Sequence, residues 1–246
     1  MSRLLLGLAL VALGGCSRID PAASRGLPDA GALRYVALGD SYTIGTSVAP
    51  GDRWPNLLVD RLGSGSPSLR LVDNLAVNGF TSADVIEQEL PHLDERRPEF
   101  VSLLVGVNDV VQGVPVARFE ANAAALLDAL LARVPADRIV VVSTPDYTVT
   151  PEGASFGDPA IQSAGIVRNN AILAALANAR GIAYVDVYDL SLRAADDPSL
   201  MADDGLHPSG AQYAMWVERI APVVAALLGR PDARTPDATT PDATLD

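Results

Sequence analysis

Five short runs of β-forming apolar residues restrict the folds open to this chain more than any other feature. The runs are Arg34 to Leu38, Leu69 to Asn74, Phe100 to Val105, Arg138 to Ser143 and Ile182 to Val187. They are nearly continuous in apolar residues, which is typical of parallel strands that are buried on both faces. A helical pattern follows each run, at Trp54 to Leu62, Ser82 to Arg97, Val116 to Val134, Ile161 to Arg180 and Ser209 to Leu228.

This alternation predicts one α/β domain. Right-handed crossovers place helices on both faces of a parallel sheet, so we expect a three-layer α/β/α sandwich with a five-stranded parallel sheet in the flavodoxin-like order. The 246 residues are 49% hydrophobic and 20% charged, which is ample material for a core. Pro91 interrupts the second helical pattern and is expected to kink that helix or to end it near Leu90.

The first strand leads directly into the tripeptide Gly39-Asp40-Ser41. Ligands bind at the carboxyl ends of the strands in such a sheet, so this turn could hold a reactive hydroxyl at the binding edge. The tripeptide alone fits equally well an ordinary turn in which Ser41 caps the following helix. Other polar groups at the same edge are needed to distinguish the two interpretations.

Polar residues do follow three further strands of the predicted sheet. Asn78-Gly79 comes after the second strand, Gly106 to Asp109 after the third, and Asp204 to His207 in the long segment after the fifth. Carboxyl ends of parallel strands share one edge, whereas a chance distribution would place such groups at both edges. We therefore expect these segments to meet near Ser41.

The four blocks GDS, Asn-Gly, GVND and DGLH, in this order, resemble the SGNH hydrolase family, also called GDSL esterases and lipases. The resemblance covers Tyr35 to Leu228, and the first block reads GDSY where the family name has GDSL. It implies that Ser41 is the nucleophile, that His207 is its base and that Asp204 orients His207.

The resemblance also implies an oxyanion hole, formed by the backbone N–H groups of Ser41 and Gly79 and the side-chain amide of Asn108. Glycine at position 79 would let the backbone N–H approach the reacting carbon, because no Cβ intervenes. Asp109, next to Asn108, is expected to brace the loop. A plain turn glycine and an Asx-turn amide are the alternatives for Gly79 and Asn108 taken singly.

Serine chemistry requires a base, and the chain has only two histidines. His92 lies within a helical stretch and is expected to be exposed. Asp203 competes with Asp204 for the role of orienting His207, and the family spacing selects Asp204. Activity is expected to fall below about pH 6 to 7, as the catalytic base becomes protonated.

These observations predict a carboxylic ester hydrolase that acts on a small-molecule, glycan or lipid ester through an acyl-enzyme on Ser41, without a cofactor. A carbohydrate O-acetylesterase, a lysophospholipase and a thioesterase are alternatives within the same family. A flavin-binding module holding a phosphate at Thr43 to Ser47, or a glycan-binding surface lipoprotein, is the alternative outside enzymes. The chain has no GxSxG motif, which disfavours an ordinary α/β-hydrolase.

Composition argues against two other classes of function. The net charge is −12, with no lysine and no basic run, so nucleic acid is not an expected partner. One cysteine and two histidines are too few for a zinc site, and the acidic residues lack EF-hand spacing. We predict no bound metal.

The chain begins with Arg3 and the apolar run Leu4 to Leu13, which is too short to span a bilayer and predicts a signal peptide over residues 1–15. The segment ending in Cys16 resembles the bacterial lipoprotein signal, which implies lipidation of Cys16 and an extracytoplasmic, membrane-anchored protein. Simple secretion is the alternative. Residues 16–33 are then a flexible tether, 34–229 the SGNH hydrolase domain, and 230–246 a disordered tail with repeated Pro-Asp-Ala.

One long connection is expected to shape the substrate pocket. Thr144 to Pro159 is unusually long for a compact domain and lies at the binding edge, with Tyr147 and Phe156 as candidate lining residues. A decorative surface loop is the alternative. Trp54 is expected either to form another wall of the pocket or to belong to the core.

Overall fold

The computed structural model describes residues 31–63 and 67–229. The predicted signal peptide, Cys16, almost all of the predicted tether and the Pro-Asp-Ala tail lie outside these residues. The described part from Gly31 onward forms a single compact unit. None of its helices is both long and apolar enough to cross a bilayer.

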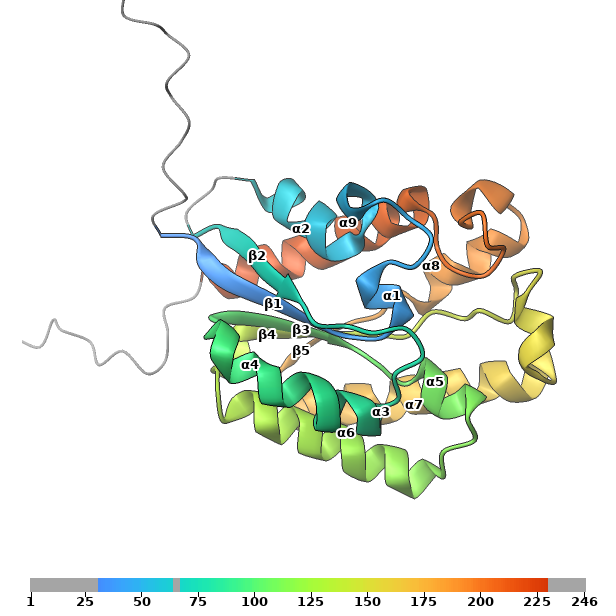
Figure 1. Ribbon diagram of the computed structural model, residues 1–246, viewed down its shortest axis with the longest axis horizontal. Helices are drawn as coiled ribbons and strands as arrows, with labels where there is room; N and C mark the ends of the chain where they lie inside the picture. Colours follow the sequence, from blue (N-terminus) through green and yellow to red (C-terminus); the bar gives the residue numbers. More distant parts are fainter. Residues whose placement is uncertain (1–30, 64–66, 230–246) are drawn as a thin grey trace, which may run out of the picture. The chain divides into compact units, whose positions relative to one another are not determined.

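All strands of the sheet run parallel, in the order β2-β1-β3-β4-β5 (Figure 1). This confirms the predicted five-stranded sheet and its flavodoxin-like order. In this order β2 lies on one side of β1, whereas β3, β4 and β5 follow on the other side. The strand order therefore reverses between β1 and β3, and sheets of this kind bind ligands at that point. Gly39 at the end of β1 pairs with Leu104 at the end of β3. The strands are β1 (Leu33–Gly39), β2 (Leu69–Asn74), β3 (Phe100–Leu104), β4 (Ile139–Val142) and β5 (Ala183–Val185).

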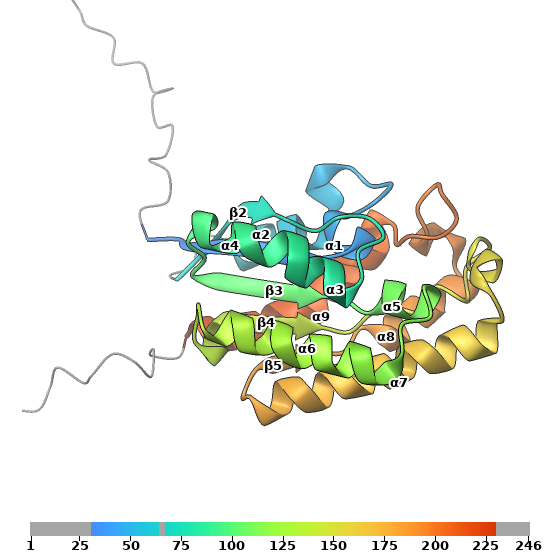
Figure 2. The same ribbon diagram turned by 60° about the horizontal axis from the view of Figure 1, so that its bottom comes forward.

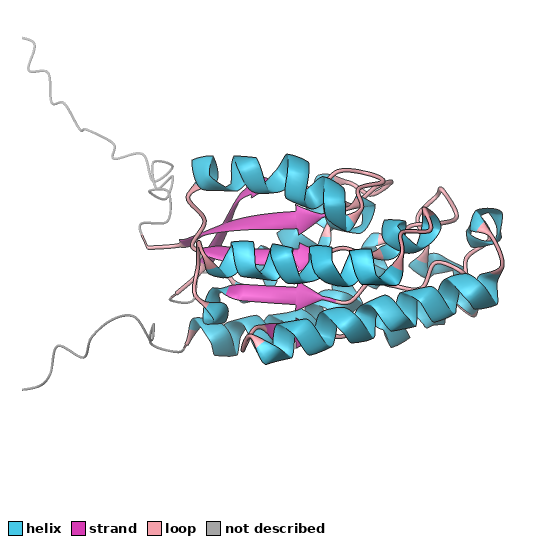
Figure 3. Ribbon diagram, turned by 90° about the horizontal axis from the view of Figure 1, so that it is seen from below, coloured by secondary structure: helices cyan, strands magenta, loops and turns pink. Residues whose placement is uncertain are grey.

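Helices cover both faces of the sheet, which completes the three-layer α/β/α sandwich (Figures 1 and 2). Side chains alternate along β1, so that Tyr35 and Ala37 pack with α2 and α9 on one face. Val36 and Leu38 pack on the other face with α4, α6 and α7. Figure 3 views this face, with the helices lying over the strands and running alongside them. The longer helices are α2 (Trp54–Leu62), α4 (Leu90–Arg96), α6 (Val116–Leu131), α7 (Pro159–Ala179) and α9 (Gly210–Leu228).

The second helical pattern is continuous, but it is not a uniform α-helix. It consists of α3 (Ser82–Asp84), a π-helical turn η2 (Val85–Glu89) and α4. Pro91 lacks an N–H group, and the backbone widens immediately before it, with the Leu90 N–H bonded to the Val85 carbonyl. The proline is therefore accommodated by a wider turn, and the helix does not end at Leu90.

Short helices that the periodicity did not indicate follow three of the strands. They are α1 (Ser41–Ile44), α5 (Val107–Val111) and α8 (Tyr188–Leu192). Asp40 caps α1, because its side-chain Oδ1 accepts a hydrogen bond from the Tyr42 N–H at 3.0 Å. Ser41 is thus the first residue of the helix, and the interpretation of Ser41 as its cap is wrong.

Candidate active site

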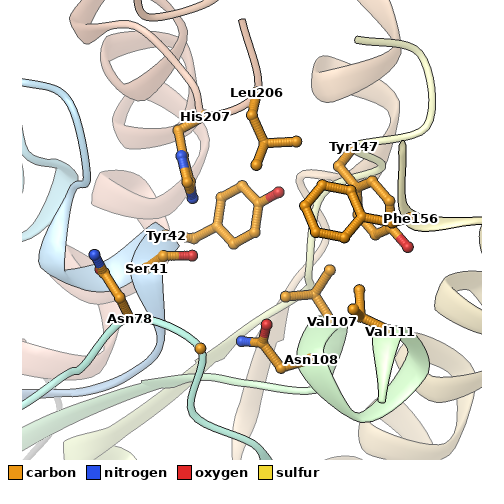
Figure 4. A pocket seen from close by; sticks show the side chains of 11 residues that line it. Ser41, Tyr42, Asn78, Val107, Asn108, Val111, Tyr147, Phe156, Leu206 and His207 are labelled. Atoms are coloured by element: carbon orange, nitrogen blue, oxygen red, sulfur yellow. The ribbon is translucent and has the colours of Figure 1, made fainter. Parts of the chain in front are cut away.

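A cavity of about 180 Å³ opens at the carboxyl edge of the sheet (Figure 4). Each segment that the sequence placed at this edge contributes to it: the turn after β1, the Asn78-Gly79 loop, α5 and the loop that carries His207. The predicted long connection after β4 closes another side. The lining residues are Ser41, Tyr42, Asn78, Gly79, Val107, Asn108, Val111, Tyr147, Phe156, Leu206 and His207.

Ser41 lies where β1 ends against β3. The chain can turn there only at a glycine, because Gly39 has φ 146° and an added Cβ would collide with the Leu104 carbonyl oxygen. Ser41 itself is 8% exposed, so its hydroxyl faces the cavity from a largely buried position. No residue in the described part of the chain forms a hydrogen bond with this hydroxyl, and contacts of this kind commonly tighten only when substrate is bound.

The loop before α9 wraps around one carboxylate. Asp204 Oδ2 lies 2.7 Å from His207 Nδ1, and Asp204 Oδ1 accepts the backbone N–H groups of Leu206 and His207 at 3.0 and 2.9 Å. The carboxylate favours the tautomer with the proton on Nδ1, which leaves Nε2 free to accept a proton. In Figure 4 the His207 ring and the Ser41 side chain face the same cavity.

Asp204 is held in its charged form. Burial acts to raise the pKa of this carboxyl, but hydrogen bonds from Ser47, His207 and the backbone outweigh that effect and lower the pKa below its usual range. The carboxylate is therefore ionised at neutral pH and can stabilise an imidazolium. The neighbouring Asp203, the competing candidate, has an exposed side chain.

The two remaining predicted donors, at Gly79 and Asn108, line the same cavity as His207. Asn108 Nδ2 donates to the Phe80 carbonyl oxygen at 3.0 Å, which fixes the amide and leaves its second N–H for a ligand. Gln112 Nε2 donates to the Gly79 carbonyl oxygen at 3.1 Å and steadies that peptide.

The structure gives a further reason for glycine at position 79. Gly79 has φ 81°, a conformation that other residues adopt only with strain. An added Cβ would meet no atom within 4 Å. The backbone conformation therefore favours glycine here, and the expected close approach of the substrate to this N–H stays a prediction.

Asp109 braces the loop behind Asn108. Its carboxylate accepts the Ser82 N–H at 2.9 Å and the Ser82 hydroxyl at 2.5 Å, so it joins α5 to the start of α3. The interpretation of Asn108 as an Asx-turn amide does not describe its contact with Phe80, which lies 28 residues away in the chain.

Apolar and aromatic side chains form the remaining walls. Tyr147 and Phe156 meet edge to face with ring centroids 5.5 Å apart, and both line the cavity as expected. Trp54 is fully buried and belongs to the core, so it does not form a wall. His92 has a 59% exposed side chain on α4, as expected.

The sequence reasoning missed several cavity residues. Tyr42 packs its ring on His207 at 5.3 Å between centroids, and Leu206 and Val111 line the cavity. Tyr42 and Leu206 are adjacent in the chain to Ser41 and His207, and Val111 lies one helical turn after Val107. Proximity to predicted catalytic residues is the signal that could have identified them.

No three His, Cys, Asp or Glu side chains within residues 31–63 and 67–229 are grouped as metal ligands would be. The expected absence of a metal stays a prediction from composition.

Comparison with solved structures supports the fold. The structure of TesA matches with 22% identity and a TM-score of 0.61, over 79% of this chain and 99% of TesA. Axe2, an acetylxylan esterase from Geobacillus stearothermophilus, matches with 21% identity and a TM-score of 0.59, over 81% of this chain and 95% of Axe2. No curated protein sequence matches the chain significantly.

The sequence itself carries the family assignment. The model of the GDSL-like lipase/acylhydrolase family matches residues 37–215, a range that holds all the residues predicted for the triad and the oxyanion hole. This range is well over half of the chain. The protein therefore belongs to the GDSL-like lipase/acylhydrolase family, the SGNH hydrolases.

Proposed function

We propose that the protein is a serine esterase in which Ser41 is the nucleophile, His207 the general base and Asp204 the residue that orients His207. One observation carries the proposal. The Asp204–His207 pair, at 2.7 Å, meets Ser41 at one cavity. Gly79 and Asn108 line the same cavity, although these groups come from four separate segments of the chain.

The reaction follows from the positions of these groups. His207 Nε2 takes the proton of Ser41 as its oxygen attacks the ester carbonyl carbon, and the same proton then leaves with the alcohol. A water molecule, deprotonated by His207, attacks the resulting acyl-enzyme and releases the acid. The N–H groups of Ser41, Gly79 and Asn108 would bind the oxyanion, and each such donor typically lowers the barrier by about 2.7–4 kcal/mol.

The chemistry of a structural neighbour supports this assignment. Variants of Axe2 with alanine in place of one serine, one aspartate and one histidine are each described as catalytic mutants. The Axe2 aspartate and histidine are three positions apart, as Asp204 and His207 are.

The cavity favours an ester with an uncharged, apolar acyl group. Six of its lining side chains, from Tyr42, Val107, Val111, Tyr147, Phe156 and Leu206, are aromatic or aliphatic. A volume of about 180 Å³ suits an acyl chain of a few carbons better than a long fatty acyl chain. A carbohydrate O-acetylesterase is the second candidate, because Axe2 is an acetylxylan esterase.

A fluorophosphonate probe tests the nucleophile, and a series of p-nitrophenyl esters of increasing chain length tests the substrate class. Ser41→Ala should lose labelling and almost all turnover while its circular dichroism stays unchanged. Ser155→Ala, which removes an exposed hydroxyl from the long connection after β4, is the matched control and should keep both. Wild-type turnover by Ser41→Ala would refute the assignment. Faster release of acetate from acetylated xylan than from any simple ester would favour the second candidate.

We further propose that Cys16 is lipidated and that the enzyme works anchored at the extracytoplasmic side of a membrane. The lipoprotein-type segment before Cys16 supports this. Cys16→Ser should abolish incorporation of labelled palmitate and release the protein from the membrane fraction. Unchanged membrane retention of Cys16→Ser would refute the anchor.

A further inference from the structure

Two buried carboxyl groups lie beneath the nucleophile turn, and the mechanism above uses neither of them. Asp40 is 0% exposed and immediately precedes Ser41, and Glu89 is 1% exposed at the end of the π-helical turn η2. The two residues are far apart in the chain, but Glu89 reaches the end of β1, where it contacts the backbone of Gly39, the residue before Asp40. A buried carboxyl group is costly unless it is paired, so this pair requires a physical explanation.

Each carboxyl group uses one oxygen to hold the turn. Glu89 Oε2 accepts the backbone N–H of Gly39 at 2.9 Å, and Asp40 Oδ1 accepts the N–H of Tyr42 at 3.0 Å. The other two oxygens, Glu89 Oε1 and Asp40 Oδ2, are fully buried and have no hydrogen-bond partner within the described part of the chain. No arginine there forms an ion pair with either group.

One proton on this pair can give both unpaired oxygens a hydrogen-bond partner. If Glu89 is a carboxylic acid, its O–H can donate to the unpaired oxygen of Asp40, which converts two orphaned acceptors into one strong hydrogen bond. We propose that Glu89 is a positioning residue of the active site, which, in its protonated form, bridges Gly39 and Asp40 and thereby fixes the turn that presents Ser41.

The π-helical turn explains why Glu89 faces inward. The Leu90 N–H bonds to the Val85 carbonyl, five residues back, because Pro91 disturbs the regular α-helical pattern. The extra residue turns Glu89 toward β1, whereas Glu87 in the same turn is exposed. π-Helical turns of this kind are frequent at functional sites.

The surroundings favour the protonated pair. Burial raises the pKa of Glu89 to about 9; the Gly39 N–H acts against this shift and the charge of Asp40 adds to it. Burial also raises the pKa of Asp40 to about 8, and the negative charge of Asp109 on α5 adds to this shift. The hydroxyl groups of Tyr42 and Tyr213, from α1 and α9, are neutral here because burial raises the pKa of each.

Two further titratable residues share a surface depression with Glu89. They are Glu87 and His92, both from its own helical segment and both exposed. Neither forms a hydrogen bond or an ion pair with Glu89 in the described residues. Loss of the Glu89 proton at alkaline pH would therefore leave two adjacent buried carboxylates, and their repulsion would displace the turn that holds Ser41.

The test compares the pH dependence of kcat and KM in the wild type and in variants of Glu89. Wild-type kcat should fall about fivefold between pH 9 and pH 10, because about half of a group with a pKa of about 9 is protonated at pH 9 and roughly a tenth at pH 10. Glu89→Gln keeps one donor and one acceptor but cannot titrate, so it should restore most of the neutral activity and lack the alkaline decline. Glu89→Leu should lose about 10- to 100-fold in kcat at pH 7 with little change in KM, since it no longer holds the turn but leaves the cavity intact.

Glu87→Gln is the matched control: it removes a carboxylate from the same turn and should retain the wild-type pH profile. An alkaline decline that persists in Glu89→Gln, or full kcat in Glu89→Leu, would overturn the proposal. If Glu89→Leu does not fold, Glu89→Gln alone decides.

The activity measurements rest on the proposed esterase function, and an infrared measurement separates the two ideas. A carbonyl band of a protonated carboxylic acid should be present at neutral pH in the wild type and in Ser41→Ala. The band should weaken in Glu89→Gln, in which Asp40, whose pKa burial also raises, is the remaining carboxyl group of the pair that can carry a proton. Absence of the band in the wild type would overturn the acid pair whether or not Ser41 is the nucleophile. Its presence in a protein without esterase activity would refute only the proposed function.

Discussion

Ser47 and His207 contact the same carboxylate oxygen of Asp204, at 2.6 Å from the Ser47 hydroxyl and 2.7 Å from the ring Nδ1. Ser47 and Asp204 are 157 residues apart in the chain, so this contact joins the segment after α1 to the loop that carries His207. Ser47 also has φ 65°, which is unusual for a residue other than glycine. Backbone strain of this kind is often found at functional sites, and here it accompanies the hydrogen bond from the Ser47 side chain to Asp204.

Removal of that hydroxyl should weaken catalysis without abolishing it. Ser47→Ala leaves Asp204 with one donor fewer, and a charge-assisted hydrogen bond at an exposed position should cost about 3- to 10-fold in kcat with KM unchanged. Ser199→Ala is the matched control, because Ser199 donates to Asp197 at 2.6 Å in an equally exposed Ser–Asp pair outside the cavity. Equal kcat values for both variants would show that Ser47 does not orient Asp204.

Asp204→Asn should have a much larger effect. An amide in place of the carboxylate favours the wrong His207 tautomer and cannot stabilise the imidazolium, so kcat should fall by about 10³- to 10⁴-fold while the fold is retained. Steady-state kinetics on p-nitrophenyl acetate, with circular dichroism, measures both. Asp203→Asn changes the exposed neighbour and should leave kcat within about twofold. A large loss in Asp203→Asn and none in Asp204→Asn would reverse the two roles.

Asn108→Ala tests the proposed oxyanion donor. Loss of its amide should reduce kcat by about 10²- to 10³-fold and change KM little, because the oxyanion exists only in the transition state. Asn178→Ala, on the exposed surface of α7, removes an amide far along the chain from the cavity loops and should have no effect. A rise in KM with kcat unchanged for Asn108→Ala would instead indicate that Asn108 binds the ground-state substrate.

The strand order and the position of the candidate site followed from the sequence because both depend on local patterns. Continuous apolar runs mark buried strands, and parallel strands bring the residues that follow them to one edge. Ser41, Asn108 and His207 could therefore be placed at one edge, and the structure brings them to one cavity.

Features that depend on tertiary contacts could not be read from the same patterns. The π-helical turn arises because Pro91 and the burial of Glu89 act together, and periodicity alone shows only a helix. The assignment of the α1 cap to Asp40 depended on backbone angles at the end of β1, which the tripeptide does not specify. The contact of Ser47 with Asp204 joins two segments that are 157 residues apart, so no spacing in the sequence predicts it.

The aromatic pair of Tyr147 and Phe156 should set the upper limit of acyl-chain length. Phe156 lines the cavity and is 38% exposed, so Phe156→Ala enlarges the cavity without leaving a void in the hydrophobic core. The ratio of kcat/KM for an octanoyl ester to that for an acetyl ester should rise, since each additional buried methylene contributes about 0.8 kcal/mol. Ile161→Ala, at an exposed apolar side chain outside the cavity lining, is the control. An unchanged ratio in Phe156→Ala would show that the acyl group binds elsewhere.

The buried acids should make the protein less stable as pH rises above 5. In the unfolded chain Asp40 and Glu89 release their protons near pH 4, whereas burial raises the pKa of Asp40 to about 8 and that of Glu89 to about 9 in the folded state. Between these values the folded state binds more protons than the unfolded state, so the free energy of unfolding must decrease as pH increases, and the dependence should level off above about pH 9.

Urea unfolding at pH 5, 7 and 9 measures this slope of the free energy of unfolding against pH. Glu89→Gln removes one of the two groups and should flatten it, whereas Glu87→Gln should not. Asp204 acts in the opposite sense, because its lowered pKa stabilises the folded state above pH 4 and is lost on acidification, so its contribution is constant over the measured range. A slope that is the same in Glu89→Gln as in the wild type would mean that Glu89 is already ionised in the folded protein.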